Sequence, residues 1–246
     1  MTQKQIDINC DVGEGIGNEA ELLPLISSCN IACGGHAGDE SSIREVIRLA
    51  KRHNVKVGAH PSYPDKENFG RVIMDIPTTE LKKNIREQLH GFMRVLEEEQ
   101  LELHHIKPHG ALYNIIAEDE EMAFIFLDAI ENYRHIPIYL PYLSKIHRAA
   151  IKRGFRFYLE AFADRNYNSE LRLVSRSSEN AVMHDAKMVF EHLLKMVMDE
   201  KVKTIEGVFR GIKAHTFCVH GDTPAALQIL TYLSQELPKY QIVIRK

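Results

Sequence analysis

The amino-acid sequence predicts an α/β protein folded as a distorted parallel β/α barrel. Short apolar runs alternate with amphipathic helical patterns, an order that produces a parallel sheet covered by helices. Groups that carry protons or charge follow almost every apolar run, which favours a closed barrel over an open sheet with one switch point. No linker, repeat or low-complexity segment divides the 246 residues. A chain of this length can bury one full core, so we expect a single domain covering 1–246.

Seven segments have the length and apolar character of β-strands. They would make a barrel one strand short of the usual eight. The fifth segment ends in Leu140 and Pro141 and carries no obvious reactive group, so we interpret it as structural. The seven predicted strands are 6–10, 29–33, 55–59, 104–107, 136–140, 155–159 and 215–219.

Helical patterns separate most of these strands. The apolar residues of 43–50 recur at i, i+3, i+4 and i+7, and Ser42 with Glu45 resembles a capping box before them. The apolar pattern over 81–96 predicts a longer helix, which begins at Thr78. We expect further helices over 119–133, 144–153 and 185–199.

The last helix is expected to follow Thr223 and Pro224. Thr223 would cap it, and a proline is tolerated in the first turn because the N–H groups there have no intrahelical partner. The residues on its inward face are then Ala226, Leu230, Leu233 and Leu237.

The composition and charge of the chain indicate which binding partners and which cellular location to expect. The chain is 44% hydrophobic and 26% charged, as in an ordinary globular protein. Its net charge is −3, and scattered Lys and Arg form no basic stripe, so we expect neither a nucleic-acid nor a membrane partner. With no signal peptide and no long apolar span, we expect a cytoplasmic protein.

The four cysteines are Cys10, Cys29, Cys33 and Cys218, and none forms a Cys-x-x-Cys pair. In the cytoplasm they would be reduced thiols. Cys29 and Cys33 could join His36 in a metal site, although a free cysteine is more often a small buried core residue. Whether a divalent metal is bound therefore stays open.

The polar clusters at the strand ends carry the chemistry. Side chains alternate along a strand, so Asn9 shares a face with Asp11, and Lys107 shares one with His109. Burying unpaired charges costs several kcal/mol, so an inward-facing set must pair, bind a metal or bind a ligand. The clusters are 9–14, 30–39, 58–65, 107–114, 160–165 and 220–222.

Taken singly, several of these residues have structural explanations. His60 before Pro61 could cap a strand, Asp39 could be a helix N-cap, and Glu14 could be an exposed loop carboxylate. Their shared location at one end of the barrel is what favours a site.

The residue types favour hydrolysis. The sequence has neither the Gly-x-Ser-x-Gly elbow of serine hydrolases nor a Gly-x-x-x-x-Gly-Lys phosphate loop. The glycine-rich stretch 13–17 could cradle a phosphate but lacks dinucleotide-binding spacing. Carboxylates, histidines and a lysine together suit activation of water and stabilisation of an oxyanion, with or without a metal. Such a site would hydrolyse an amide, an ester or a lactam.

At these clusters the chain resembles the LamB/YcsF family of 5-oxoprolinase A subunits. The resemblance runs from Asp7 to about Leu237, with long motifs at 30–39, 58–65 and 107–114 and a further one at 160–167. It implies a seven-stranded barrel like those of glycoside hydrolases and carbohydrate deacetylases. It also implies ATP-dependent opening of 5-oxo-L-proline to L-glutamate, with ADP and phosphate as products and separately encoded B and C subunits as partners.

The clusters and the resemblance together suggest roles for individual residues. We expect the partner subunits to handle most of the ATP and its Mg²⁺, because this chain has no recognisable nucleotide motif; self-association is left open. We expect catalytic roles for Asp11, His60, Lys107, His109, Glu160, His220 and Asp222. We expect substrate-binding roles for Asn9, Glu14, Asn30, His36, Asp39, Arg71, Tyr113, Asn114, Asp164 and Arg165.

Lys107 is expected to stabilise a developing oxyanion or phosphate, with Asp11 or Glu160 as the general base. On this interpretation Lys107→Met lowers turnover with little change in melting temperature. Two alternatives stay open. One is a metal-dependent deacetylase or amidohydrolase on the same barrel, and the other is a non-catalytic lactam-binding subunit.

The chain departs from the family pattern at three places. Gly35 stands where family members usually have Phe, and Val72 stands where they usually have Arg. The stretch 168–176 lacks the usual Gly and Pro. We expect these departures to affect substrate preference more than reaction class.

Overall fold

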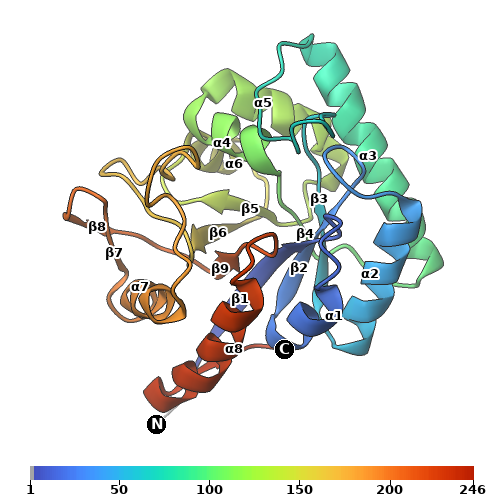
Figure 1. Ribbon diagram of the computed structural model, residues 1–246. Coiled ribbons are helices and arrows are strands. Elements are labelled where there is room, and N and C mark those ends of the chain that lie inside the picture. Colours follow the sequence, from blue (N-terminus) through green and yellow to red (C-terminus); the bar gives the residue numbers. More distant parts are fainter. Residues whose placement is uncertain (1–2) are drawn as a thin grey trace.

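The computed structural model describes residues 3–246 and contains a closed barrel of parallel strands (Figure 1). Each strand pairs in parallel with the next, and β9 pairs with both β6 and β1, which closes the barrel. The predicted seven-stranded barrel is therefore confirmed, with strand ends shifted by a few residues. Its strands are β1 (Lys4–Val12), β2 (Ser28–Ala32), β3 (Lys56–His60), β4 (His105–Ile106), β5 (Ile138–Pro141), β6 (Phe157–Phe162) and β9 (Thr216–Val219).

Helices surround the barrel (Figure 1). The α-helices are α1 (Glu19–Leu22), α2 (Glu40–Arg52), α3 (Thr78–Glu98), α4 (Gly110–Glu118), α5 (Glu120–Ala129), α6 (Lys145–Arg153), α7 (Ala186–Asp199) and α8 (Ala226–Glu236). Short 3₁₀ turns are η1 (Leu23–Leu25), η2 (Glu131–Tyr133) and η3 (Leu237–Tyr240). The predicted helix over 119–133 divides into α5 and η2, while α1 and α4 were not predicted.

Side-chain caps explain why three helices begin where the sequence predicted. The side chains of Asp119, Ser144 and Asp185 each accept a hydrogen bond from the backbone N–H three residues later, so α5, α6 and α7 begin as expected. The inward residues predicted for α8 are also buried.

Two predicted caps were wrong, whereas the long helix α3 begins at Thr78 as predicted. Asp39, rather than Ser42, caps α2: its Oδ1 accepts from the Ser42 N–H at 2.8 Å, and Ser42 Oγ accepts from the Asp39 N–H at 2.8 Å. Thr223 does not cap α8, because its hydroxyl donates to the carbonyl of His220 at 3.4 Å and the helix begins only at Ala226.

Three short strands lie outside the predicted set. β10 (Ile242–Ile244) pairs in parallel with the amino end of β1. β7 (Lys201–Lys203) and β8 (Phe209–Gly211) form an antiparallel hairpin that continues from α7 (Figure 1). Within the described residues, no helix combines the length and the apolar character needed to cross a bilayer.

Hydrogen-bonded polar side chains fill part of the barrel interior. Asp7 Oδ1 accepts from the hydroxyls of Ser28 at 2.9 Å and Thr216 at 2.6 Å. One layer nearer the carboxyl ends, Nε2 of His105 lies 2.6 Å from Oδ1 of Asn30. Only glycine fits at position 58, because a Cβ there would lie 2.1 Å from His105 Nε2. These buried polar side chains lie directly below the carboxyl ends of the strands, where the reactive clusters are found.

Candidate active site

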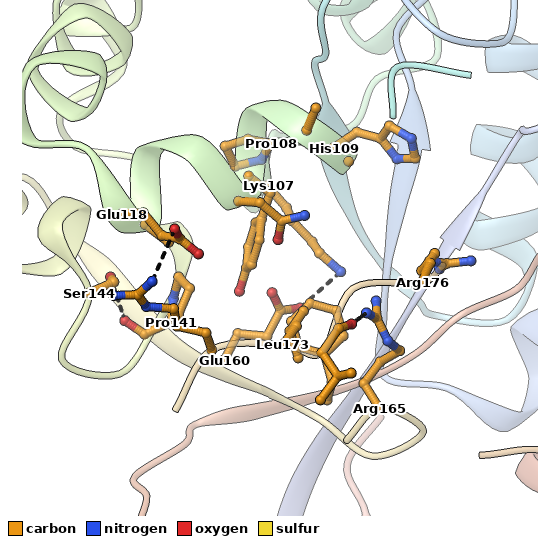
Figure 2. A pocket seen from close by; sticks show the side chains of 18 of the residues that line it. Lys107, Pro108, His109, Glu118, Pro141, Ser144, Glu160, Arg165, Leu173 and Arg176 are labelled. Atoms are coloured by element: carbon orange, nitrogen blue, oxygen red, sulfur yellow. Dashed lines mark hydrogen bonds and ion pairs between the residues drawn. The ribbon is translucent and has the colours of Figure 1, made fainter. Parts of the chain in front are cut away.

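A cavity of about 620 Å³ opens at the carboxyl ends of the barrel strands (Figure 2). Most of the predicted site residues contribute to its wall, including Asp11 and His60, which lie far apart in the sequence. The predicted residues that line it are Asp11, Glu14, His60, Arg71, Lys107, His109, Tyr113, Asn114, Glu160, Arg165, His220 and Asp222. Asn9, Asn30, His36, Asp39 and Asp164 lie outside this wall.

Lys107 lies at the base of the cavity between two carboxylates that come from β1 and β6. Its Nζ is 3.0 Å from Asp11 Oδ1 and 3.0 Å from Glu160 Oε1 (Figure 2). Its remaining donor is shared between Asn9 Oδ1 at 3.3 Å and Cys218 Sγ at 3.1 Å. A thiol is a weak acceptor, so the Cys218 contact is the one that a ligand oxygen could most easily replace.

These contacts determine the charge state at the base of the cavity. Burial alone would lower the pKa of Lys107, but Asp11 and the neighbouring acidic groups outweigh it and hold that pKa well above its usual value. Burial would likewise raise the pKa of Asp11, yet Lys107 and then His60 hold it well below the ordinary range. Lys107 and Asp11 therefore form a buried ion pair.

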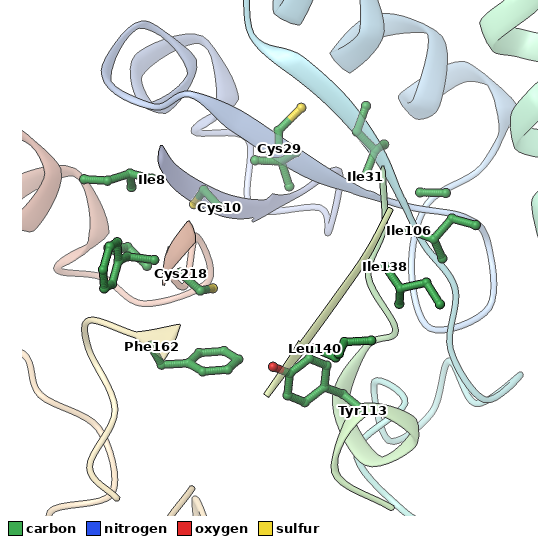
Figure 3. Close-up of a cluster of buried hydrophobic side chains, with 14 of the residues drawn as sticks. Ile8, Cys10, Cys29, Ile31, Ile106, Tyr113, Ile138, Leu140, Phe162 and Cys218 are labelled. Atoms are coloured by element: carbon green, nitrogen blue, oxygen red, sulfur yellow. The ribbon is translucent and has the colours of Figure 1, made fainter. Parts of the chain in front are cut away.

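Two buried polar atoms at this base make no hydrogen bond of good geometry within residues 3–246. They are Tyr113 Oη and Glu160 Oε2, and the Tyr113 hydroxyl lies close to the Glu160 carboxylate. Burial, followed by the charge of Glu160 and hydrogen bonding toward it, raises the pKa of Tyr113 well above its usual value, so its hydroxyl stays protonated. The Tyr113 ring packs edge-on against Phe162, with 5.5 Å between ring centroids (Figure 3). A buried donor and a buried acceptor thus stand available to a ligand.

The side-chain amides of Asn9 and Asn30 position two carboxylates of the site by hydrogen bonds. Asn9 Nδ2 donates to Glu160 Oε1 at 2.9 Å, and Asn30 Nδ2 donates to Asp11 Oδ1 at 2.7 Å. Both amides were predicted to bind substrate, but they lie one layer below the cavity and position Glu160 and Asp11 instead.

Asp164 and His220 form a second hydrogen-bonded pair. His220 Nδ1 is 2.9 Å from Asp164 Oδ1, and the His220 backbone N–H donates to Asp164 Oδ2 at 2.9 Å. Burial would raise the pKa of Asp164, but the His220 ring and backbone N–H outweigh it and lower that pKa. The ionised carboxylate therefore accepts from Nδ1–H, which leaves Nε2 of His220 as the basic ring nitrogen on the cavity side.

A cluster of four buried residues lies at another part of the wall, and three of the four line it. Glu14 Oε1 is 3.0 Å from His36 Nε2 and 3.4 Å from His109 Nδ1. His60 Nε2 is 3.0 Å from His109 Nδ1 and 3.5 Å from Asp11 Oδ1. The rings of His36 and His109 are stacked in parallel, with 3.6 Å between centroids. We call Glu14, His36, His60 and His109 the histidine cluster; together they could hold a metal ion.

Arginines form the outer rim of the cavity. Arg71 and Arg176 both pair with Asp222, the latter at 3.4 Å. Arg165 donates to the backbone carbonyls of Ala181 at 3.2 Å and Val174 at 2.6 Å, so it also holds the covering loop. The sequence indicated an effect of 168–176 on substrate preference but gave no role to individual rim residues from Glu170 to Arg176, because that loop has no strand or helix pattern to place it.

The three places where the chain departs from the family pattern lie at different distances from the cavity. The stretch 168–176 supplies much of the rim, whereas Val72 is exposed outside the cavity wall. At Gly35 a Cβ would lie 2.4 Å from Ser62 Oγ and 2.5 Å from Gln88 Oε1. Gln88 thus fills the space beside Gly35, bonded to the backbone N–H and carbonyl of Ser62.

Asp39, Cys29 and Cys33 do not belong to the cavity wall. Asp39 lies at the exposed start of α2 and caps it, away from the cavity. All four cysteines are free and buried, and within the described residues Cys29 and Cys33 do not join His36 in a metal-binding group. Cys33 Sγ instead accepts the His60 N–H at 3.2 Å, and burial raises the Cys33 pKa to about 12.

Comparison with known proteins places this barrel in a family. The family model for LamB/YcsF matches residues 6–246. The A subunit of 5-oxoprolinase from Thermococcus sibiricus is 41% identical, covering 98% of this chain and 96% of that protein. The same-named protein from Campylobacter jejuni is 39% identical with the same coverage.

Solved structures agree with this placement. A lactam utilization protein from Thermus thermophilus superposes with a TM-score of 0.91 at 34% identity, covering 98% of this chain and 99% of that one. A peptidoglycan deacetylase from Bacillus subtilis, at 9% identity and a TM-score of 0.52 over 99% of this chain and 87% of that one, shares the fold alone. This chain therefore belongs to the LamB/YcsF family.

Proposed function

We propose that this chain is the A subunit of a 5-oxoprolinase and carries out the hydrolytic opening of 5-oxo-L-proline to L-glutamate. Relatives that bear this name match almost its full length at about 40% identity. The observation that carries the proposal is the pair of buried atoms without a hydrogen bond of good geometry, Tyr113 Oη and Glu160 Oε2, beside Lys107.

These atoms complement a lactam. A five-membered lactam holds its amide in the cis form, so its N–H and C=O lie on the same edge of the ring. Glu160 Oε2 can accept from the N–H, while Tyr113 O–H or Lys107 Nζ donates to the carbonyl oxygen. A lactam therefore satisfies groups that the free chain leaves unsatisfied, whereas a cyclic amine without the carbonyl would not.

Hydrolysis needs a base for water and a donor for the oxygen that becomes negative. His220 Nε2, oriented by Asp164, is placed to take a proton from water. The hydroxide adds to the lactam carbonyl carbon, and Lys107 stabilises the negative charge on the carbonyl oxygen or on its phosphate as its Cys218 contact is released. The C–N bond then breaks, and the proton held by His220 passes to the departing nitrogen. Ionised Asp11 keeps Lys107 charged throughout.

ATP supplies the driving force. An unactivated lactam closes readily. Phosphorylation of its carbonyl oxygen by ATP, which leaves ADP, would make the carbonyl carbon more electrophilic. Hydroxide addition and C–N cleavage then give a γ-glutamyl phosphate, which a second water molecule hydrolyses to glutamate and phosphate.

The separately encoded B and C subunits would carry out most of the phosphorylation with Mg²⁺, because this chain has no phosphate loop. In the glycine-rich stretch 13–17, the Gly13 N–H already donates to Glu19 Oε1 at 3.0 Å. Arg71 and Arg176 at the rim suit an incoming phosphate.

The test is glutamate formation from 5-oxoproline by the reconstituted complex. The complete mixture with ATP should produce glutamate, and leaving out this chain, either partner or ATP should abolish it. Glutamate formation at an unchanged rate without this chain would overturn the proposal. The metal-dependent deacetylase alternative draws support from the fold and from the buried residues that could hold a metal ion.

A further inference from the structure

The histidine cluster contains more groups than lactam hydrolysis uses. All four members are buried, with His36, His60 and His109 at 2%, 1% and 6% exposure and Glu14 at 8%. They come from separate segments at or after the ends of β1, β2, β3 and β4, so only the closed barrel brings them together. Such convergence of imidazoles and a carboxylate needs its own explanation.

Hydrogen bonds fix the tautomers of two of the rings. His60 Nδ1 lies 2.6 Å from the backbone carbonyl of Lys107, and His109 Nε2 lies 2.9 Å from the backbone carbonyl of Phe69. A carbonyl oxygen can only accept, so each of these nitrogens must carry a hydrogen. In the neutral rings, the opposite nitrogens, His60 Nε2 and His109 Nδ1, then carry bare lone pairs.

Those two lone pairs face each other. His60 Nε2 and His109 Nδ1 are 3.0 Å apart, and Glu14 Oε1 lies 4.0 Å from the first and 3.4 Å from the second. Three acceptors thus converge without a donor between them. The arrangement is repulsive unless a positive group occupies the space.

We propose that Glu14, His60 and His109 bind one divalent transition-metal ion. Two ligands at about 2.1 Å from one ion are separated by about 3.0–3.4 Å when they occupy adjacent positions. The three observed separations, 3.0, 3.4 and 4.0 Å, need only a small contraction to reach that range. Two imidazoles and one carboxylate suit Zn²⁺ and its first-row neighbours rather than Ca²⁺ or Mg²⁺.

His36 positions the carboxylate rather than binding the ion. Its ring lies parallel to His109 within 1°, so the in-plane lone pairs of the two rings cannot point at one ion. His36 Nε2–H instead donates to Glu14 Oε1 at 3.0 Å, which leaves the unpartnered Nδ1 as a bare acceptor. The carbonyls of Lys107 and Phe69 orient His60 and His109 in the same way, as outer partners of metal-bound histidines do.

The ion would face the cavity, since Glu14, His60 and His109 all line it. When bound there, it supplies a Lewis acid beside the reacting carbonyl or water. Gly70 makes room for the cluster: a Cβ there would lie 2.9 Å from His36 Cβ and 3.1 Å from His109 Cδ2.

The test measures metal binding by the tag-free full-length chain. After treatment with a chelator and dialysis, Co²⁺ and Zn²⁺ are titrated by calorimetry, and the visible absorption of Co²⁺ reports its ligands. We expect one ion per chain. His60→Asn and His109→Asn should each weaken binding by roughly a hundred-fold or more, and His36→Asn by roughly ten- to a hundred-fold. His90→Asn, which removes an exposed histidine of α3, is the matched control and should change nothing.

Circular dichroism of each variant verifies folding, and added Zn²⁺ should raise the melting temperature of the parent but not of His109→Asn. Binding that is equally tight in the parent and in His60→Asn would overturn the proposal. So would the absence of any bound ion, because a shared proton would then fill the space between the two rings.

Discussion

Nζ of Lys107 lies 3.0 Å from Oδ1 of Asp11, although Asp11 belongs to β1 and Lys107 directly follows β4 on the other side of the barrel. The same ammonium is 3.0 Å from Glu160 Oε1, so one buried cation compensates two buried carboxylates. This relationship changes what a substitution at Lys107 should do. The residue cannot lose its charge without leaving both carboxylates uncompensated.

Lys107→Met should therefore lower both stability and turnover. Leaving buried charges without a partner costs about 3–5 kcal/mol of unfolding free energy, measurable by urea denaturation. Loss of the oxyanion donor should lower turnover of the reconstituted complex by roughly ten- to a thousand-fold. Adding Glu160→Gln should restore part of the stability without the turnover. A single variant as stable as the parent would contradict the three-way ion pair.

Tyr113→Phe should have opposite effects on stability and activity. Its hydroxyl makes no hydrogen bond of good geometry in the described chain, so removing it should leave the unfolding free energy unchanged or raise it. If the hydroxyl donates to the lactam carbonyl, kcat/KM for 5-oxoproline should fall by roughly three- to ten-fold. Unchanged kcat/KM would remove Tyr113 from the binding site.

Asp164→Asn should lower kcat through His220. Asp164 is fully buried and does not line the cavity, so it acts only by orienting His220 and stabilising its charged form. We expect a loss in kcat of roughly 10²- to 10⁴-fold with little change in KM. Asp185→Asn, at the N-cap of α7, is the control for the same chemical change. A change confined to KM would assign Asp164 to substrate binding instead.

The same carboxylate should contribute to acid sensitivity. The pKa of Asp164 is lower in the folded chain than in the unfolded chain, so its contribution is present above the unfolded value of about 3.9 and is lost as pH falls through the folded pKa. The difference in unfolding free energy between the parent and Asp164→Asn should therefore shrink below about pH 4. A difference that stays constant from about pH 7 to about pH 3 would contradict this assignment.

Gly35→Ala should destabilise the chain by about 1–3 kcal/mol, because the new Cβ displaces Gln88 from its two bonds to Ser62. Gly91→Ala is the matched control, since a Cβ there meets nothing within 4 Å in the helix α3. That control should stabilise by about 0.5–1 kcal/mol. Equal effects of the two substitutions in chemical denaturation would show that Gly35 is not tightly packed.

The barrel and most of the site could be predicted because strand periodicity is simple. Alternation placed Asn9 and Asp11 on one face, and parallel strands bring their carboxyl ends together, so the clusters that contain Asp11 and His60 were expected at one end of the barrel. They are found there, with 3.5 Å between Asp11 Oδ1 and His60 Nε2. The long helical patterns were correct for the same reason.

What could not be predicted depends on tertiary contacts. In the adjacent pair His104 and His105, the pattern does not say which ring points inward, and only the space left by Gly58 shows it. The Phe69 carbonyl that fixes the His109 tautomer lies in a loop without periodicity. Helix α4 begins inside the 107–114 motif, where the apolar Ala111 and Leu112 gave no clear amphipathic signal.

The most direct test of the central claim is glutamate formation by a complex assembled with Asp11→Asn. Glu160 still pairs with Lys107 in this variant, so the chain should fold and assemble, which size-exclusion chromatography can verify. Asp119→Asn, at the N-cap of α5, is the control. The account predicts that Asp11→Asn lowers glutamate formation by roughly ten- to a hundred-fold, because Lys107 loses the carboxylate that holds its charge at the reacting oxygen, while Asp119→Asn leaves it unchanged. Full activity of the Asp11→Asn complex would contradict the assignment of the Lys107–Asp11 pair to lactam hydrolysis.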